Sequence, residues 1–188
     1  GDGVRLRVSD GAPSLDFAAY EADLVIQWAD APVRGVVTEP LMKSGRYPVI
    51  SPALQAREAV ETPEDLRRLT LMHDETMDAW EEWFEAAGVE APVFPRGPTF
   101  PNCELATTAA ERGLGVSLAY DVVVRGTLEE GRLVRLFDTM VMPFVIYSVA
   151  YSEPRSADPM IREFSDWVHR EVLQEGASPA ARSPEGNA

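Results

Sequence analysis

The segment from residue 97 to residue 118 constrains the fold more than any other part of this chain. It reads GPTFPN, CELATTAAER and GLGVSL, which predicts the end of a strand with a sharp turn, then a helix, a glycine turn and a strand. Pro98 and Pro101 prevent the backbone from running straight into the helix, and Asn102 is a good N-cap. A helix N-terminus at the carboxyl end of a strand attracts small anions. The segment therefore indicates either a pocket for a metabolite carboxylate or an ordinary β-α-β crossover with nothing bound.

Composition excludes several classes of protein. The 188 residues carry a net charge of −14, and such an acidic surface repels nucleic-acid phosphates. No apolar run approaches the roughly 18 residues that a membrane span requires, and the opening residues do not resemble a signal peptide. The single cysteine excludes an internal disulfide and fits a reducing compartment. We expect a cytoplasmic protein that does not bind nucleic acid or membrane through this chain.

Strands and helices alternate along the chain, which predicts an α/β fold with mostly parallel sheets. Two long extended segments, Tyr47–Ser51 and Tyr147–Tyr151, flank a middle block. The chain is therefore expected to leave one lobe, build a second and return, so that two crossover strands form a hinge and a cleft. The predicted division is residues 1–46 plus 152–175 for lobe I, 47–151 for lobe II and 176–188 for a disordered tail.

Local signals predict several helices. Thr62 and Pro63 form a helix start, and a helix from Met77 to Ala87 is predicted to end at Gly88. Two separate short helices are expected near Asp121–Arg125 and Leu128–Gly131. An amphipathic helix over Met160–Leu173 should bury one face, which carries Ile161, Phe164, Trp167 and Val168.

Polar and aromatic residues near strand ends are the candidate ligand contacts. Ser51 ends the first crossover strand, although it could equally cap the following helix. Asp30 could bind an ammonium group or be an ordinary loop acid, and Phe100 could line a pocket or pack in the core. The other candidates taken from the residues are Trp28, Thr99, Asn102, Cys103 and Tyr120.

Catalysis is not expected. Cys103, His73 and Asp74 are the nucleophile-and-base set to consider, and a thiol at a helix N-terminus should have a lowered pKa. However, His73 and Asp74 are adjacent in a strand and should point to opposite faces. Two histidines and one cysteine, far apart in sequence, give no metal-ligand spacing, so we expect neither metal nor cofactor. The aromatic residues Trp80, Trp83 and Phe84 at helical spacing are more typical of a core than of a ligand site.

A resemblance to a known family rests on short motifs spread in order along the chain. They include ADLVI at 22–26, PVISPAL at 48–54, TPEDL at 62–66, TLMHD at 70–74, GPTF at 97–100, GLGV at 113–116, GRLV at 131–134, YSVAY at 147–151 and FSDW at 164–167. In these motifs the chain resembles the effector-binding domain of LysR-type transcriptional regulators, in the glycine-cleavage-activator-like subgroup.

The resemblance implies a two-lobed fold similar to type II periplasmic binding proteins, with a small-molecule effector in the cleft and Tyr147 among its contacts. It also implies a homodimer or homotetramer of the parent regulator, which would contact DNA only through an N-terminal helix-turn-helix that this chain lacks. The first strand and helix of lobe I should precede Gly1, so lobe I is expected to be incomplete. A stand-alone solute-binding protein and a small thiol hydrolase using Cys103 are the alternative interpretations.

Overall fold

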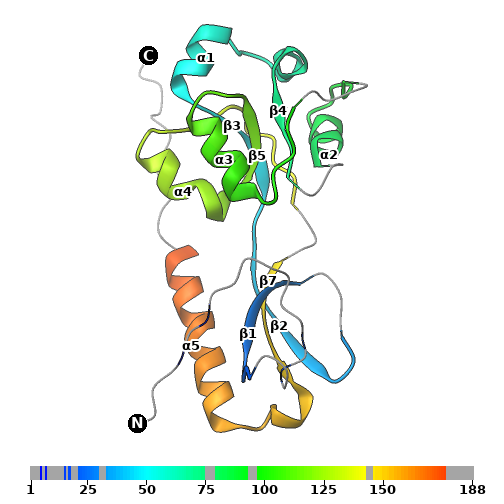
Figure 1. Cartoon of the computed structure of the whole chain (residues 1–188), viewed down its shortest axis with the longest axis vertical. Helices are drawn as coiled ribbons and strands as arrows, with labels where there is room; N and C mark the ends of the chain where they lie inside the picture. Colours follow the sequence, from blue (N-terminus) through cyan, green and yellow to red (C-terminus); the bar gives the residue numbers. More distant parts are fainter. Residues whose placement is uncertain are drawn as a thin grey trace, which may run out of the picture. The chain divides into compact units, whose positions relative to one another are not determined.

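The computed structural model describes residues 5, 7, 15, 17, 21–29, 33–74, 79–92, 97–142 and 146–176. The chain forms two compact units, each drawn in Figure 1. Unit 1 comprises Gly1–Lys43 and Phe144–Ala188, and unit 2 comprises Ser44–Pro143. The predicted tail, residues 176–188, lies outside the described residues except for Gly176, which ends a helix.

Unit 1 contains a sheet of three strands, β1 (Val25–Ala29), β7 (Ile146–Ser152) and β2 (Val36–Lys43), in that order. Strand β7 pairs antiparallel with both neighbours. The sequence analysis placed this strand in lobe II, and its pairing with β1 and β2 corrects that assignment. Helix α5 (Pro159–Gly176), which follows the 3-10 turn Glu153–Arg155, covers one face of the sheet. The core between helix and sheet contains Val149, Tyr151, Ile161 and Val168.

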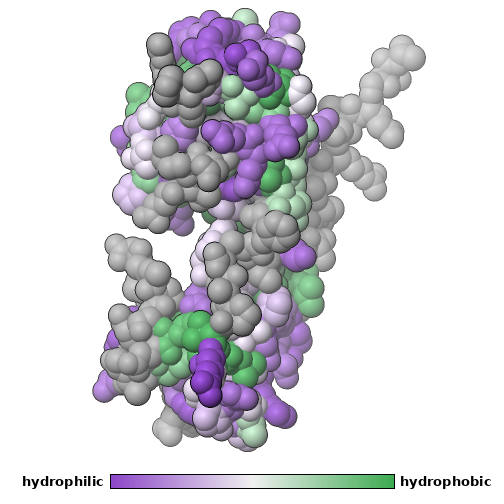
Figure 2. Space-filling model, turned by 90° about the vertical axis from the view of Figure 1, so that its right-hand side faces the viewer, coloured by the Kyte–Doolittle hydropathy of each residue, from purple (hydrophilic) through white to green (hydrophobic). Residues whose placement is uncertain are grey.

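Unit 2 contains a sheet of four strands in the order β4 (Leu71–Met72), β5 (Val116–Tyr120), β3 (Arg46–Ile50) and β6 (Val134–Arg135). Its helices are α1 (Pro52–Glu58), α2 (Ala79–Ala86), α3 (Cys103–Glu111) and α4 (Asp121–Glu129), with a 3-10 helix over Pro63–Arg68. Every residue of β3 and β5 is buried, because helices cover both faces of the sheet. On the face shown in Figure 2, the surface of unit 2 is mostly hydrophilic.

The α/β class is confirmed, but the expectation of mostly parallel sheets is wrong for the described strands. Strands β4 and β5 form a parallel pair, and every other described strand pairing is antiparallel. The reason is that strands running in the same direction are separated by a reversed one. In unit 1, β1 and β2 both run against β7, which lies between them.

Two hydrophobic clusters lie on opposite faces of the unit 2 sheet. Trp80, Trp83 and Phe84 of α2 are at most 1% exposed and pack on one face, so their interpretation as core residues is confirmed. The Trp80 ring nitrogen donates to the carbonyl oxygen of Met72 at 2.9 Å. The second cluster joins α3 and α4 to the other face, through Tyr47, Val49, Ala106, Ala110, Ala119 and Val124.

The helix predictions agree with the structure at Thr62 and differ from it in two places, the continuity of α4 and the exposure of Trp167. Thr62 and Asp65 form a capping box, as the sequence predicts. The two short helices expected between residues 121 and 131 are one continuous helix, α4. On α5, Trp167 is 47% exposed rather than buried with the apolar face, whereas His169 is half-buried against β2.

No helix in the described ranges is long and apolar enough to cross a membrane.

Candidate functional site

The candidate site lies in unit 2, at the edge of the sheet where β4 and β5 end. These strands run parallel, with Met72 paired to Ser117, so their carboxyl ends lie at the same edge. The turn that begins at Gly97 is fixed to this edge by backbone bonds from His73 to Pro98 (3.0 Å) and from Phe100 to His73 (2.8 Å). A Cβ atom at residue 97 would lie 1.6 Å from the carbonyl oxygen of Leu71, so only glycine fits there.

Helix α3 begins at this edge as the sequence predicts. The Asn102 side chain accepts a hydrogen bond from the backbone N–H of Leu105 at 2.9 Å and is the N-cap. Thr99, in the turn before it, is exposed and bridges to His73 in parallel register. The N-terminus of a helix is suited to an anionic group, and Thr99 is an exposed residue just before it.

Cys103 occupies the first position of α3 but is not an activated thiol. Burial raises the pKa of the Cys103 thiol, and the opposing effects of the Tyr120 backbone and the Thr107 hydroxyl do not offset it. The predicted lowering of this pKa is therefore wrong, because the side chain points into the protein. Phe100 is half-buried and packs with Cys103 against the hydrophobic cluster between α3, α4 and the sheet. Among the described residues, no group of three or more potential metal ligands is present.

Tyr120 ends β5 at the same edge and is 7% exposed. In the sheet register it lies opposite Arg46, and the Arg46 guanidinium stands 5.2 Å from the centre of its ring. Arg46 is a residue that the sequence analysis missed. The available signal was a charged residue at the start of an otherwise uncharged five-residue strand.

Ser51 lies at the opposite end of the sheet from this edge. Strands β3 and β5 are antiparallel, with Arg46 opposite Tyr120, so the residue after Ile50 is near the start of β5. The Ser51 hydroxyl accepts from the backbone N–H of Leu54 at 3.3 Å, which confirms its alternative interpretation as a helix cap. It lines a groove with Arg57, Arg112 and Arg132 and is not brought together with Thr99.

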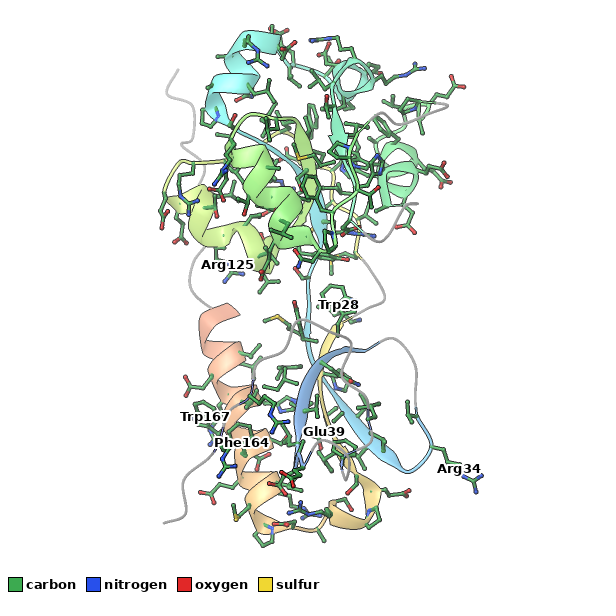
Figure 3. All side chains as sticks on the ribbon, in the orientation of Figure 1. Trp28, Arg34, Glu39, Arg125, Phe164 and Trp167 are labelled. Atoms are coloured by element: carbon green, nitrogen blue, oxygen red, sulfur yellow. The ribbon has the colours of Figure 1, made fainter. Side chains whose placement is uncertain are left out.

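The remaining candidates belong to unit 1. Trp28 and Tyr147 are register partners on β1 and β7, and their rings meet edge-on with centroids 4.9 Å apart. Trp28, labelled in Figure 3, is 39% exposed. Asp30 lies outside the described residues. The structure therefore groups Thr99, Phe100, Asn102, Cys103 and Tyr120 in unit 2, and Trp28 with Tyr147 in unit 1.

A family model and two curated relatives match this chain over most of its length. The LysR substrate binding domain family matches residues 3–173. The glycine cleavage system transcriptional activator of Escherichia coli (strain K12) is 30% identical over 168 residues, covering 88% of this chain and 55% of the relative. AmpR of Rhodobacter capsulatus, an HTH-type transcriptional activator, is 28% identical over 165 residues, covering 88% and 56%. The chain thus spans a little over half the length of these curated relatives.

Solved structures of the same kind share the fold. The effector domain of the transcriptional regulator AmpR of Pseudomonas aeruginosa superposes with a TM-score of 0.75 at 25% identity, covering 86% of this chain and 77% of that one. The AmpR effector binding domain from Citrobacter freundii has a TM-score of 0.76 at 24% identity, covering 86% and 80%. The two-lobed fold expected from the sequence is therefore confirmed, and the chain belongs to the LysR substrate binding domain family.

Proposed function

We propose that this chain is the effector-sensing regulatory domain of a LysR-type DNA-binding transcriptional regulator. The observation that carries the proposal is the family match over residues 3–173, nearly the whole described chain. The relatives that it resembles are named as transcriptional activators. In this proposal the chain senses a small molecule, and DNA is contacted by a separate helix-turn-helix in the parent regulator.

The edge of the sheet in unit 2 supports an anionic effector, such as an organic acid or an amino acid. Thr99 is an exposed residue that carries a hydroxyl group, and it precedes Asn102, the N-cap of α3, whose N-terminus carries a partial positive charge. A net charge of −14 disfavours anions over the surface as a whole, so an anion needs such a local donor set to bind. Within unit 1, Trp28 and Tyr147, whose rings meet edge-on, remain proposed effector contacts.

In this proposal, the effector regulates the parent protein because it binds two conformations of the domain with different affinities. An effector that binds one conformation of the domain more tightly shifts the population toward that conformation. In a homodimer or homotetramer of the parent regulator, that shift would change the geometry of the DNA-reading domains. A hydrolase using Cys103 is disfavoured, because the thiol is buried and its pKa is raised.

The proposal is tested by thermal unfolding of the chain against a panel of amino acids and small carboxylates. A ligand at about 100 times its dissociation constant adds roughly 2.7 kcal/mol, which raises the midpoint by several degrees. We expect a selective rise with one chemical class. Thr99→Val should reduce that rise, whereas Thr108→Val should not, since Thr108 bonds only within α3 in the described structure. Cooperative unfolding with no shift from any compound in the panel would reject this effector class.

A further inference from the structure

Arg46 is held in an unusual position for a charged residue. It is the first residue of β3 and is 3% exposed. Its backbone is fixed by two hydrogen bonds with Val141, at 2.7 Å from the Arg46 nitrogen and 2.9 Å to the Arg46 oxygen. The Tyr120 ring lies against the guanidinium, 5.2 Å from its centre. The backbone of Arg46 is therefore held in the sheet, and its charged group lies by Tyr120 at the end of β5, at the edge that carries the candidate site.

The guanidinium lacks the partners that a buried cation requires. Its Nη2 atom contacts Glu82 of α2 at 3.4 Å, a long hydrogen bond to a side chain that is 54% exposed. Its Nε and Nη1 atoms are buried and have no hydrogen-bond partner. A guanidinium carries five N–H donors, and burying them without acceptors is costly.

Three other described arginines have more acceptors for their N–H groups than Arg46 has. Arg132 forms ion pairs with Glu111 and Glu130, and Arg155 does so with Asp23 and Asp158. Arg135 lies over the ring of Tyr47 and donates to two backbone carbonyls. The unused donors of Arg46 thus distinguish it from these three described arginines.

We propose that Arg46 anchors the carboxylate of the effector. A carboxylate accepts two N–H groups of one guanidinium at once, and such paired bonds are among the strongest in proteins. A ligand that engages Nε and Nη2 displaces the Glu82 carboxylate, which is half exposed and can turn into solvent. The Tyr120 ring packs against the guanidinium, with its centre 5.2 Å away, and supports the charged group from one side. This assignment rests on the proposed function and specifies the chemical group that unit 2 recognises.

The test uses sodium acetate as a carboxylate without an amine and methylammonium chloride as an amine without a carboxylate. Both are compared with sodium chloride at equal ionic strength, because salt alone screens charges. Acetate should raise the midpoint of thermal unfolding of the unmodified chain. Arg46→Gln should weaken acetate binding by roughly thirtyfold or more, the usual result of removing one partner of a buried charge pair. Arg57→Gln removes the same charge from an exposed position and should leave the acetate response unchanged.

Glu82→Gln provides a second test that does not depend on the folding of Arg46→Gln. Removing the competing carboxylate should strengthen the acetate response, whereas a purely structural ion pair predicts no change in it. The Nε–H signal of Arg46 in a proton–nitrogen spectrum should also shift on addition of acetate.

The possible results separate the two proposals. A full acetate response in Arg46→Gln, or an Nε–H signal that does not move, would overturn the role of Arg46. A shift caused by panel compounds but not by acetate would also overturn it, and would leave effector sensing intact. No shift with any compound would instead reject the proposed effector class together with the anchor.

Discussion

The Ser165 hydroxyl on α5 donates a hydrogen bond to the Glu39 carboxylate on β2, with 2.5 Å between the two oxygen atoms. The other carboxylate oxygen accepts from the Tyr151 hydroxyl at 2.7 Å. Glu39, labelled in Figure 3, therefore connects the helix of unit 1 to two strands of its sheet. Burial alone would raise the pKa of Glu39, but the two hydroxyl donors, His169 and Arg162 together hold the pKa below its ordinary value.

The lowered pKa predicts a loss of stability in acid. A carboxyl group with a lower pKa in the folded protein stabilises the fold fully above its ordinary value of 4.5, and this contribution is lost as pH falls through the folded value. Glu39→Gln should remove this part of the acid dependence. The cost at neutral pH should be under about 1 kcal/mol, because the site is partly solvated. Urea unfolding at several pH values checks this, and an unchanged pH dependence would contradict it. Asp65, whose pKa is about 2, contributes separately in both proteins.

His169 should connect α5 to β2 through its Nε2 atom, while its Nδ1 atom bonds within α5. Nδ1 lies 2.8 Å from the carbonyl oxygen of Ser165, and Nε2 lies 3.2 Å from that of Pro40. Carbonyl oxygens only accept, so both bonds form together only when the ring carries two protons. His169→Phe should lower the free energy of unfolding by about 1 kcal/mol.

Nitrogen NMR checks the same bonds directly at a pH low enough to protonate the ring. The chain has two histidines, so the ring signals are few and His169→Phe assigns them. Two hydrogen-bonded N–H groups on His169 are expected. A ring with one N–H exchanging freely with water would show that the link to Pro40 is absent.

Tyr47 should stabilise unit 2 through its hydroxyl. The group donates to Asp121 at 2.7 Å, and the side chain is 1% exposed. Tyr47→Phe keeps the ring and should cost about 1–2 kcal/mol. Burial, and then the bond to Asp121, raise the pKa of Tyr47, so this contribution is present below pH 10.0 and lost at higher pH. The variant should therefore lose stability less steeply in alkali, although Tyr151 retains its own share. Equal slopes in both proteins would contradict the prediction.

Two glycine substitutions should have opposite effects. Gly97→Ala places a methyl group 1.6 Å from the Leu71 carbonyl oxygen, so the turn and β4 must separate. We expect a loss of several kcal/mol, at the upper end for single substitutions. Gly126→Ala, in the middle of α4, meets nothing within 4 Å and should gain up to about 1 kcal/mol from helix propensity. Thermal unfolding of both variants measures this difference, and similar midpoints would refute it.

Local features of the fold were predictable from the sequence. The turn and helix around Asn102 and the capping box at Thr62 depend on residues within one turn of each other, so their signals are visible in the printed order. The ligand contacts proposed from the sequence remain predictions.

Long-range partners were not predictable in the same way. The pairing of β7 with β1 and β2, and the contact of Arg46 with Tyr120, join residues more than 70 positions apart. Extended, mostly apolar segments such as Tyr47–Ser51 are compatible with parallel and antiparallel neighbours alike, so the predicted direction of strand pairing was wrong. The contact of His169 with Pro40 was not predictable either, because it depends on how α5 packs on β2.

The central position of β7 has a consequence for the order in which the chain is made. Residues 44–143 form one continuous stretch, so unit 2 can fold on the ribosome while the rest of the protein is still being synthesised. Unit 1 cannot follow the same course, because β1 and β2 have emerged long before the strand that must lie between them. Until residues 146–152 leave the ribosome, both strands carry unpaired edges that can bind other chains. Strands β1 and β2 therefore reach their native pairing only after β7 has been made, later than the sheet of unit 2.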